Sequence, residues 1–208
     1  MIAIVDYGVG NLQSLARAFA SIGAPVEIAT TPGQIAAAKG VVLPGVGHFQ
    51  EAMDHLRLGD LLPALEQRVR VESAPLLGVC LGMQLLMQRS EEGDYAGLGW
   101  IAGEVASLRT RHPDASLKVP HIGWNTIQPE PGSILFHEVP AEATFYFAHS
   151  FAVFEVGDTV AASRTRYGVP FVSAVEQGNV FGTQFHPEKS HQNGVHVLRN
   201  FVAHVQQH

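Results

Sequence analysis

Short, mainly apolar runs alternate with helical patterns in the first half of the chain, and this alternation constrains the fold more than any other feature. Residues 1–5, 26–29 and 41–43 are such runs, and they are typical of strands buried on both faces of a parallel sheet. Residues 11–22 carry apolar side chains at spacings of three and four, which predicts an amphipathic helix, and a short helix should start near Pro32. This order of elements predicts a doubly wound α/β fold.

The alternation of helices and strands continues to about residue 89, and the pattern changes beyond Trp100. Residues 61–71 favour a helix, residues 75–79 favour a strand that leads into Cys80, and residues 83–89 favour the next helix. Beyond Trp100, strand-like segments follow one another without long helices between them: residues 104–108, 144–147, 160–165, 172–176 and 180–184. A hairpin turn is predicted at 175–180 and a last helix at 194–206. We therefore expect an open, mostly parallel, doubly wound mixed sheet flanked by helices, with antiparallel strands in the C-terminal half.

The composition favours one globular unit. A chain of 208 residues with 46% hydrophobic and 15% charged residues can bury a full core, so we expect residues 1–208 to form a single domain. A net charge of −6 lacks the basic footprint of proteins that bind nucleic acid or an anionic membrane, and we expect neither partner. One cysteine cannot form an internal disulfide, no signal-peptide pattern is visible, and no apolar run approaches the roughly 20 residues that span a bilayer. These features predict a soluble protein of the reducing cytoplasm.

The single cysteine lies in Gly78-Val79-Cys80-Leu81-Gly82, which has the form of a nucleophile elbow. Glycines on both sides of a strand-to-helix turn let the backbone crowd together and expose the side chain between them. The turn also places the sulfur near the amino end of the next helix, whose dipole favours a nucleophilic thiolate. The alternative is a buried cysteine that acts as a small hydrophobic residue.

A thiol nucleophile needs a base, and His186-Pro187-Glu188 offers one. Proline favours an extended conformation at the preceding residue, and residues two apart on an extended chain point to the same side. Glu188 can then orient the imidazole of His186, which takes and returns protons. The alternative is an ordinary surface turn.

The loop Pro44-Gly45-Val46-Gly47 follows the third predicted strand, at the edge where ligands gather in open α/β sheets. A backbone N–H of Val46 or Gly47, together with that of Leu81, could hold the oxyanion of a tetrahedral intermediate. A simple tight turn is the alternative.

Taken together, Gly78-Val79-Cys80-Leu81-Gly82-Met83-Gln84 and His186-Pro187-Glu188 resemble the motifs of the class I, triad-type glutamine amidotransferases. Further segments look like those of the glutaminase subunits of imidazole glycerol phosphate synthases, and they span nearly the whole chain: residues 6–14, 44–47, 121–125, 146–150 and 184–190. The resemblance implies that Cys80 is the nucleophile, His186 the general base and acid, and Glu188 the residue that orients the imidazole. We expect no cofactor and no catalytic metal.

The same resemblance implies which residues bind the substrate, glutamine. Gln84 and Glu92 would hold its amino-acid end, helped by the backbone around Gly47 and His149-Ser150. Because Glu92 follows Glu91, a solvated pair of carboxylates is the alternative for either one.

The resemblance also implies a heterodimer in which ammonia passes to a barrel-shaped synthase subunit. There it would react with a ribulosyl-aminoimidazole carboxamide nucleotide to give imidazole glycerol phosphate, for histidine biosynthesis, and an aminoimidazole carboxamide ribonucleotide. The chain has no phosphate-binding loop of its own. Trp124, Asn125, Tyr146 and Lys189 are candidates for the docking face, although Trp124 could equally belong to the core.

Several other functions compete with this one. Gly8-Val9-Gly10 with Glu27 suggests a dinucleotide site, but Gln13 stands where the third glycine belongs. His204 and His208 have helical spacing, but no further ligand completes a zinc site. Amidotransferases that feed anthranilate, aminodeoxychorismate, pyridoxal phosphate or guanine nucleotide synthesis could share the triad, and residues 6–14 and 121–125 argue against them. A catalytically silent scaffold subunit would have no need of the triad.

Overall fold

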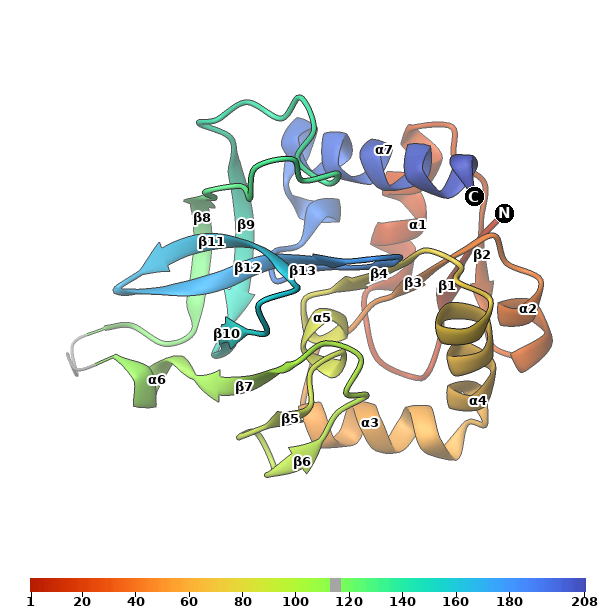
Figure 1. Cartoon of the computed structure of the whole chain (residues 1–208), viewed down its shortest axis with the longest axis horizontal. Helices are drawn as coiled ribbons and strands as arrows, with labels where there is room; N and C mark the ends of the chain where they lie inside the picture. The colour runs from red at the N-terminus through yellow and green to blue at the C-terminus, as the bar shows by residue number, and fades with distance from the viewer. Residues whose placement is uncertain (113–116) are drawn as a thin grey trace.

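A mixed β-sheet of eleven strands forms the centre of the computed structural model, which describes residues 1–112 and 117–208 (Figure 1). In chain order its strands are β1 (Ile2–Val5), β2 (Val26–Ala29), β3 (Gly40–Leu43), β4 (Leu76–Val79), β5 (Arg89–Ser90), β6 (Tyr95–Ala96), β7 (Gly103–Ser107), β10 (Phe151–Val156), β11 (Ala161–Tyr167), β12 (Val169–Gln177) and β13 (Val180–Thr183). Across the sheet the order is β2-β1-β3-β4-β13-β12-β10-β7-β5-β6, and β11 pairs with β12. A separate antiparallel pair consists of β8 (His121–Thr126) and β9 (Thr144–His149).

The direction of the strands changes halfway across the sheet. β2, β1, β3, β4 and β13 are parallel, whereas β12, β11, β10 and β7 join by antiparallel pairing. β1, β3, β4 and β13 are buried along their full length, as expected for central parallel strands that are covered on both faces. The predicted fold class is confirmed. The predicted hairpin is present as well, since Gln177 of β12 pairs with Val180 of β13.

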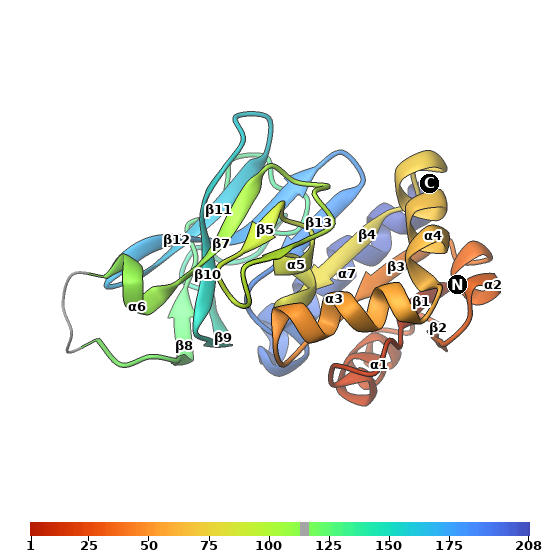
Figure 2. The same ribbon diagram turned by 90° about the horizontal axis from the view of Figure 1, so that it is seen from below.

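Helices cover both faces of the parallel part of the sheet (Figures 1 and 2). In chain order the helices are α1 (Leu12–Ser21), α2 (Pro32–Ala36), α3 (Phe49–Leu58), α4 (Leu61–Leu65), the π-helix η1 (Glu66–Val71), α5 (Leu81–Leu85), α6 (Leu108–Arg111), the 3-10 helix η2 (Pro187–Lys189) and α7 (His191–Gln207), of which α6 lies beside β7, away from the parallel strands. Alternate residues of β1 face two cores, because successive side chains of a strand point to opposite sides. Ile4 packs in the core that holds Leu15 of α1 and Phe201 of α7, and Val5 in the core that holds Leu56 of α3. Across residues 1–112 and 117–208, no helix has the length and hydropathy needed to cross a membrane.

The helix predicted at residues 83–89 is wrong at its end. α5 finishes at Leu85, and Arg89–Ser90 is strand β5, paired with β7. The cause is a competition for carbonyl groups. The Leu98 N–H donates to the Leu85 carbonyl, and the Trp100 N–H donates to the Leu86 carbonyl. These carbonyl groups therefore accept hydrogen bonds from a later segment of the chain and not from a further turn of the helix.

α3, β8 and β10 lie outside the predicted elements. α3 carries apolar residues at helical spacing, namely Phe49, Ala52, Met53 and Leu56, so the signal is present in the sequence. Its N-cap residue, His48, makes no side-chain hydrogen bond that would mark the start of a helix. The cap comes from a distant residue: the Phe49 N–H donates to Glu92 Oε2 at 2.9 Å.

The turn after β4 gives a stability prediction, because a Cβ added at Gly82 would overlap the carbonyl oxygen of Leu43 in β3. We expect Gly82→Ala to lower the free energy of unfolding by about 3 kcal/mol, since both segments are backbone and neither can rotate away. Urea unfolding measures the effect. Gly33→Ala is the matched control, because nothing lies within 4 Å of its added Cβ and alanine suits helix α2 better than glycine. A Gly82→Ala protein as stable as the wild type would contradict the close approach of α5 and β3.

Candidate active site

Cys80 lies on the sharp turn between β4 and α5. Its backbone has φ 55° and ψ −108°, a region that non-glycine residues rarely adopt and that costs about 1–3 kcal/mol. The Cys80 N–H donates to the Thr183 carbonyl of β13 at 2.7 Å, which ties the strained residue to the neighbouring strand. The glycine at 78 is required for the same reason as that at 82, because its Cβ would press on the backbone of Gly82. α5 has five residues only, so its dipole is smaller than that of the predicted helix.

His186 and Glu188 reach Cys80 because β13 runs parallel to β4. Thr183 lies opposite Val79, so both strands end at the same edge of the sheet. His186 is extended, at φ −96° and ψ 99°, and Glu188 falls in the 3-10 turn that Pro187 begins. His186 Nδ1 and Glu188 Oε1 are 2.9 Å apart, and the two side chains are only 3% and 2% exposed. The structure thus brings together the three residues that the motifs singled out.

Ser190 holds this turn in place; it ends the segment 184–190 that resembles the family, but the sequence assigned no role to it. It is fully buried, its hydroxyl donates to the His186 carbonyl at 2.6 Å, and it accepts from the Tyr146 N–H at 2.9 Å. No spacing rule would identify it, because its partners lie on β9 and on the turn itself.

The charges around His186 favour its protonated form. Burial on its own lowers the pKa of His186, but hydrogen bonds and charge interactions with Cys80 and Glu188 outweigh burial and raise this pKa to about 10. Glu188 Oε2 is buried and has no hydrogen-bond partner among the described residues. The other oxygen of this carboxylate, Oε1, binds the imidazole of His186. At neutral pH this arrangement presents an imidazolium to the Cys80 sulfur.

A pocket of about 290 Å³ opens onto Cys80. It is lined by Val46, Gly47, Cys80, Leu81, Gln84, Glu92, Pro120, Ile122, Ala148, His149, Ser150 and Phe151. Every residue that the sequence suggested for glutamine binding or for the oxyanion is in this set. The pocket can therefore admit a small molecule to the sulfur, with residues from five separate segments around it.

Two of the lining side chains are already partly engaged. Gln84 Nε2 donates to the Phe151 carbonyl at 2.8 Å and to Gln184 Oε1 at 2.9 Å, which occupies both of its N–H groups and leaves its oxygen as an acceptor. Glu92 caps α3 through one carboxylate oxygen. Glu91 accepts from the Ser107 N–H at 2.9 Å. Neither Glu91 nor Glu92 is therefore the freely solvated carboxylate of the alternative interpretation.

The loop at residues 44–47 lies against the nucleophile turn. The Leu81 N–H donates to the Gly45 carbonyl at 3.4 Å, so one of the expected oxyanion donors faces the loop in this state. Gly47 has φ +113°, which only glycine adopts readily. Tyr7 lies beneath the loop, where its hydroxyl donates to the Pro44 carbonyl at 2.5 Å; burial, and then the charge of Cys80, raise the pKa of Tyr7.

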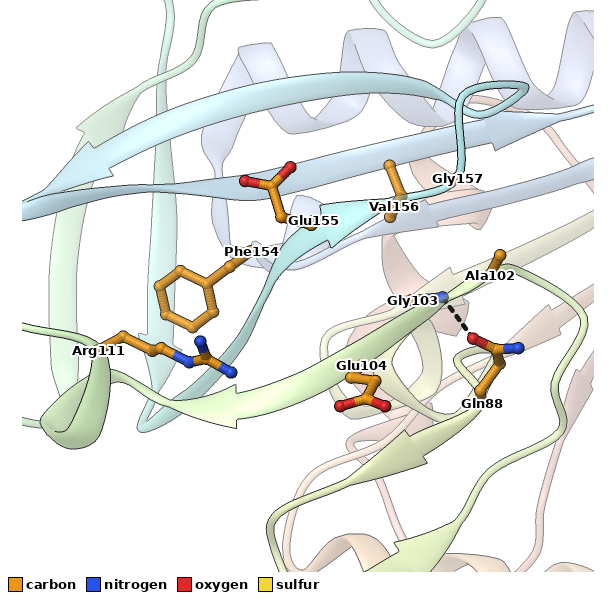
Figure 3. A pocket seen from close by; sticks show the side chains of 9 residues that line it. All are labelled: Gln88, Ala102, Gly103, Glu104, Arg111, Phe154, Glu155, Val156 and Gly157. Carbon is orange, nitrogen blue, oxygen red and sulfur yellow. Dashed lines mark hydrogen bonds between the residues drawn. The ribbon is translucent and has the colours of Figure 1, made fainter.

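A second pocket, of about 390 Å³, lies along β7 and β10 and is shown in Figure 3. The Arg111 guanidinium lies over the Phe154 ring at 5.7 Å, and Glu104 and Gln88 border the opposite side. No residue that lines this pocket is a cysteine, serine or histidine, so its ionisable side chains are those of Glu104, Arg111 and Glu155.

The competing sites gain no support from their surroundings. Glu27, the possible ribose partner, accepts a hydrogen bond from Gln34 Nε2 at 2.5 Å. The His208 ring lies 4.4 Å from that of His204 and its Nδ1 contacts the His204 carbonyl. Within residues 1–112 and 117–208, no group of three or more histidine, cysteine or acidic side chains could hold a metal ion.

A family model for class-I glutamine amidotransferases matches residues 3–205. The chain belongs to this family. It is 47% identical to the imidazole glycerol phosphate synthase subunit HisH of Moorella thermoacetica, across 96% of this chain and 93% of that one. The HisH subunit of Bdellovibrio bacteriovorus is 41% identical, across 97% and 98%. The family that the motifs indicated is therefore confirmed.

Solved structures share the fold at low identity. A putative GMP synthase subunit from Thermoplasma acidophilum superposes with a TM-score of 0.74 at 20% identity, and covers 99% of this chain and 94% of its own. A structure described as a glutamine amidotransferase superposes with a TM-score of 0.76 at 18% identity, across 99% and 100%. These two likenesses support the fold.

The electrostatics of His186 can be tested by NMR titration of labelled imidazole rings. We expect His186 to stay protonated until about pH 10, and its pKa to fall in Cys80→Ala, where burial remains but one source of the upward shift is gone. Because the pKa lies above the unfolded value of 6.5, protonation of His186 stabilises the fold fully below about pH 6.5, and this contribution is lost as pH rises through about 10.

His149 is the internal control for this titration. Burial, and then the neighbouring His121, lower its pKa to about 3, so it should stay neutral across the same range in both proteins. Titration of His186 near pH 6.5 in the wild type would contradict the ion-pair geometry.

Proposed function

We propose that this protein hydrolyses glutamine to glutamate and ammonia through a thioester on Cys80, and supplies the ammonia to a synthase subunit in histidine biosynthesis. The observation that carries the proposal is the meeting of a strained, pocket-lining cysteine with a buried His186–Glu188 pair at one edge of the sheet. The 47% identity to a HisH subunit supports the choice of pathway. The chain would act as a single glutaminase domain of residues 1–208 in the cytoplasm, where its one thiol stays reduced.

The chemistry follows from the arrangement of the triad. The Cys80 thiolate attacks the side-chain amide carbon of glutamine, and a C–S bond forms. His186 gives its proton to the leaving nitrogen, the C–N bond breaks, and ammonia departs from a thioester. Water then attacks the thioester, its proton passes to His186, and glutamate leaves as the thiolate returns. Glu188 keeps Nδ1 of the imidazole protonated, so Nε2 is the nitrogen that exchanges protons.

Substrate binding would use the acceptors that remain free in the pocket. Gln84 offers its side-chain oxygen and Glu92 its second carboxylate oxygen, and both suit the ammonium end of glutamine. The backbone at Gly47 and at His149-Ser150 lines the same pocket and supplies the remaining polar groups.

The oxyanion would be held by the Leu81 N–H and by an N–H of the loop, from Val46 or Gly47. Because the Leu81 N–H faces the Gly45 carbonyl in this state, the loop must turn that carbonyl away before the donor becomes available. Val46 is 41% exposed, so the peptide can rotate without disturbing the core.

The face beside the pocket is suited to a protein partner. Trp124 is 46% exposed, which rules out the core position considered for it, and its ring stacks on His191 at 4.9 Å. Lys189 Nζ lies 5.8 Å above the Tyr146 ring, which contacts Trp124 edge-on. Exposed aromatic side chains such as that of Trp124 are enriched in interfaces. We propose that this face docks the barrel-shaped synthase subunit.

Replacement of the nucleophile tests the mechanism. We expect Cys80→Ala to lose glutamate release by on the order of 10³-fold or more, because no other group can form the thioester. Acid-quenched wild type should carry a glutamyl adduct on the peptide that contains Cys80, and mass spectrometry detects it. Glu104→Gln, at the pocket along β7 and β10, is the control for substitution of a distant residue. Wild-type turnover in Cys80→Ala would exclude the thioester route.

The coupling to a partner is tested separately. Glutamate release by the purified chain should be weak alone and rise on the order of 10²-fold with the synthase subunit and its nucleotide, because the loop must first free the Leu81 N–H. Synthase subunits of the anthranilate, aminodeoxychorismate, pyridoxal phosphate and guanine nucleotide pathways serve as controls. Activation by one of these, and not by the histidine-pathway subunit, would reassign the acceptor. Full activity without any partner would contradict the coupling.

A further inference from the structure

Gln184 lies between the end of β13 and His186, and its side chain is fully buried beside the nucleophile. Its Nε2 lies 3.7 Å from Cys80 Sγ, within the range of a hydrogen bond to sulfur. Gln184 is not among the residues that line the pocket, so it approaches the sulfur from inside the protein and leaves the substrate side open.

A series of neighbouring hydrogen bonds fixes which group of Gln184 faces the sulfur. The Phe151 carbonyl can only accept, so Gln84 must turn its amide nitrogen towards it. The same nitrogen can only donate, so Gln184 must present its oxygen to Gln84. The remaining group of Gln184, its NH₂, then has to face Cys80 Sγ.

Two buried histidines hold the first group of this series of hydrogen bonds, the Phe151 carbonyl. His149 Nδ1 donates to the Phe151 carbonyl at 2.9 Å, so its Nε2 is free to accept. His121 Nδ1 lies 3.0 Å from that Nε2 and donates to it. Burial lowers the pKa of His121 to about 4 and, with His121 as a second cause, that of His149 to about 3, so both rings are neutral, as this order of donors requires.

We propose that Gln184 is a further catalytic residue, whose amide N–H donates to the Cys80 sulfur and stabilises its anionic form, with Gln84 and the Phe151 carbonyl as its positioning groups. The inference rests on the proposed glutaminase mechanism and adds a participant to it. A hydrogen bond to an anion is stronger than one to a neutral group, so the donor favours the thiolate over the thiol. An amide does not titrate, so this donor persists while His186 gives up and regains its proton.

The test follows alkylation of Cys80 by iodoacetamide as a function of pH, because the thiolate is the form that reacts. In Gln184→Met, which keeps the approximate volume and removes the donor, the midpoint of the alkylation profile should move upward by about one pH unit. Below the midpoint this is about a tenfold loss of rate. Glutamine turnover in the activated complex should lose kcat by a similar factor, and KM should stay unchanged in Gln184→Glu, which keeps the oxygen that accepts from Gln84 Nε2.

Two further variants separate chemistry from folding. Gln184→Glu keeps the size of the side chain and its hydrogen bond with Gln84, but turns an oxygen towards the sulfur, so its alkylation midpoint should rise at least as far. Ser173→Ala is the matched control: Ser173 is fully buried on β12 and its hydroxyl donates to the Ser163 carbonyl, away from the sulfur. Its alkylation profile should coincide with that of the wild type even if its stability falls.

The outcomes distinguish this inference from the proposed function. An unchanged alkylation midpoint in whichever Gln184 variant folds would overturn the role of Gln184, even in a protein that hydrolyses glutamine. A shifted midpoint supports it, and this readout does not need glutamine turnover. Absence of glutamine hydrolysis in the wild-type complex would instead overturn the proposed function and leave the sulfur contact standing.

Discussion

Parallel pairing of β13 with β4 is the constraint on which the rest of the site depends. The two strands are far apart in the sequence, and their register places Thr183 opposite Val79. One residue further, the Cys80 N–H binds the Thr183 carbonyl and holds the nucleophile in its strained conformation. Because both strands end at the same edge, the residues that follow Thr183 arrive beside the residue that follows Val79. A shift of this register by one residue would reverse the faces and separate the imidazole from the sulfur.

Burial gives these contacts their strength and also makes them obligatory. Cys80, His186 and Glu188 are almost completely removed from water, where an ionised group without a partner is costly. His186 interacts with both the Cys80 sulfur and the Glu188 carboxylate, and these interactions outweigh burial and raise its pKa. The buried glutamine beside them contributes a neutral donor and adds no charge. The site can therefore be dry enough for strong electrostatics and still leave few polar atoms unsatisfied.

Periodicity in the sequence was sufficient for the central strands, because β1, β3 and β4 lie between two layers of helices and need apolar residues on both faces. The turn at Cys80 could be predicted from its glycines, since Gly78 and Gly82 meet backbone and could be no other residue. By contrast, no periodicity brings His186 to Cys80; that placement came from the resemblance to a family. The end of α5 and the cap of α3 could not be predicted from the sequence. The first depends on backbone N–H groups and the second on a carboxylate, and both are supplied by distant segments.

Two side chains that line the pocket, Glu92 and Gln84, also make hydrogen bonds that hold the fold together, so they resemble structural residues. Glu92 gives one oxygen to the start of α3, and Gln84 gives both N–H groups to the Phe151 carbonyl and to Gln184. Each keeps a single acceptor for the ligand. Side chains held in this way lose little conformational entropy on binding, because folding has already fixed them. The same hydrogen bonds that orient Gln84 for the substrate orient Gln184 for the sulfur, so recognition of glutamine and stabilisation of the nucleophile depend on one buried network.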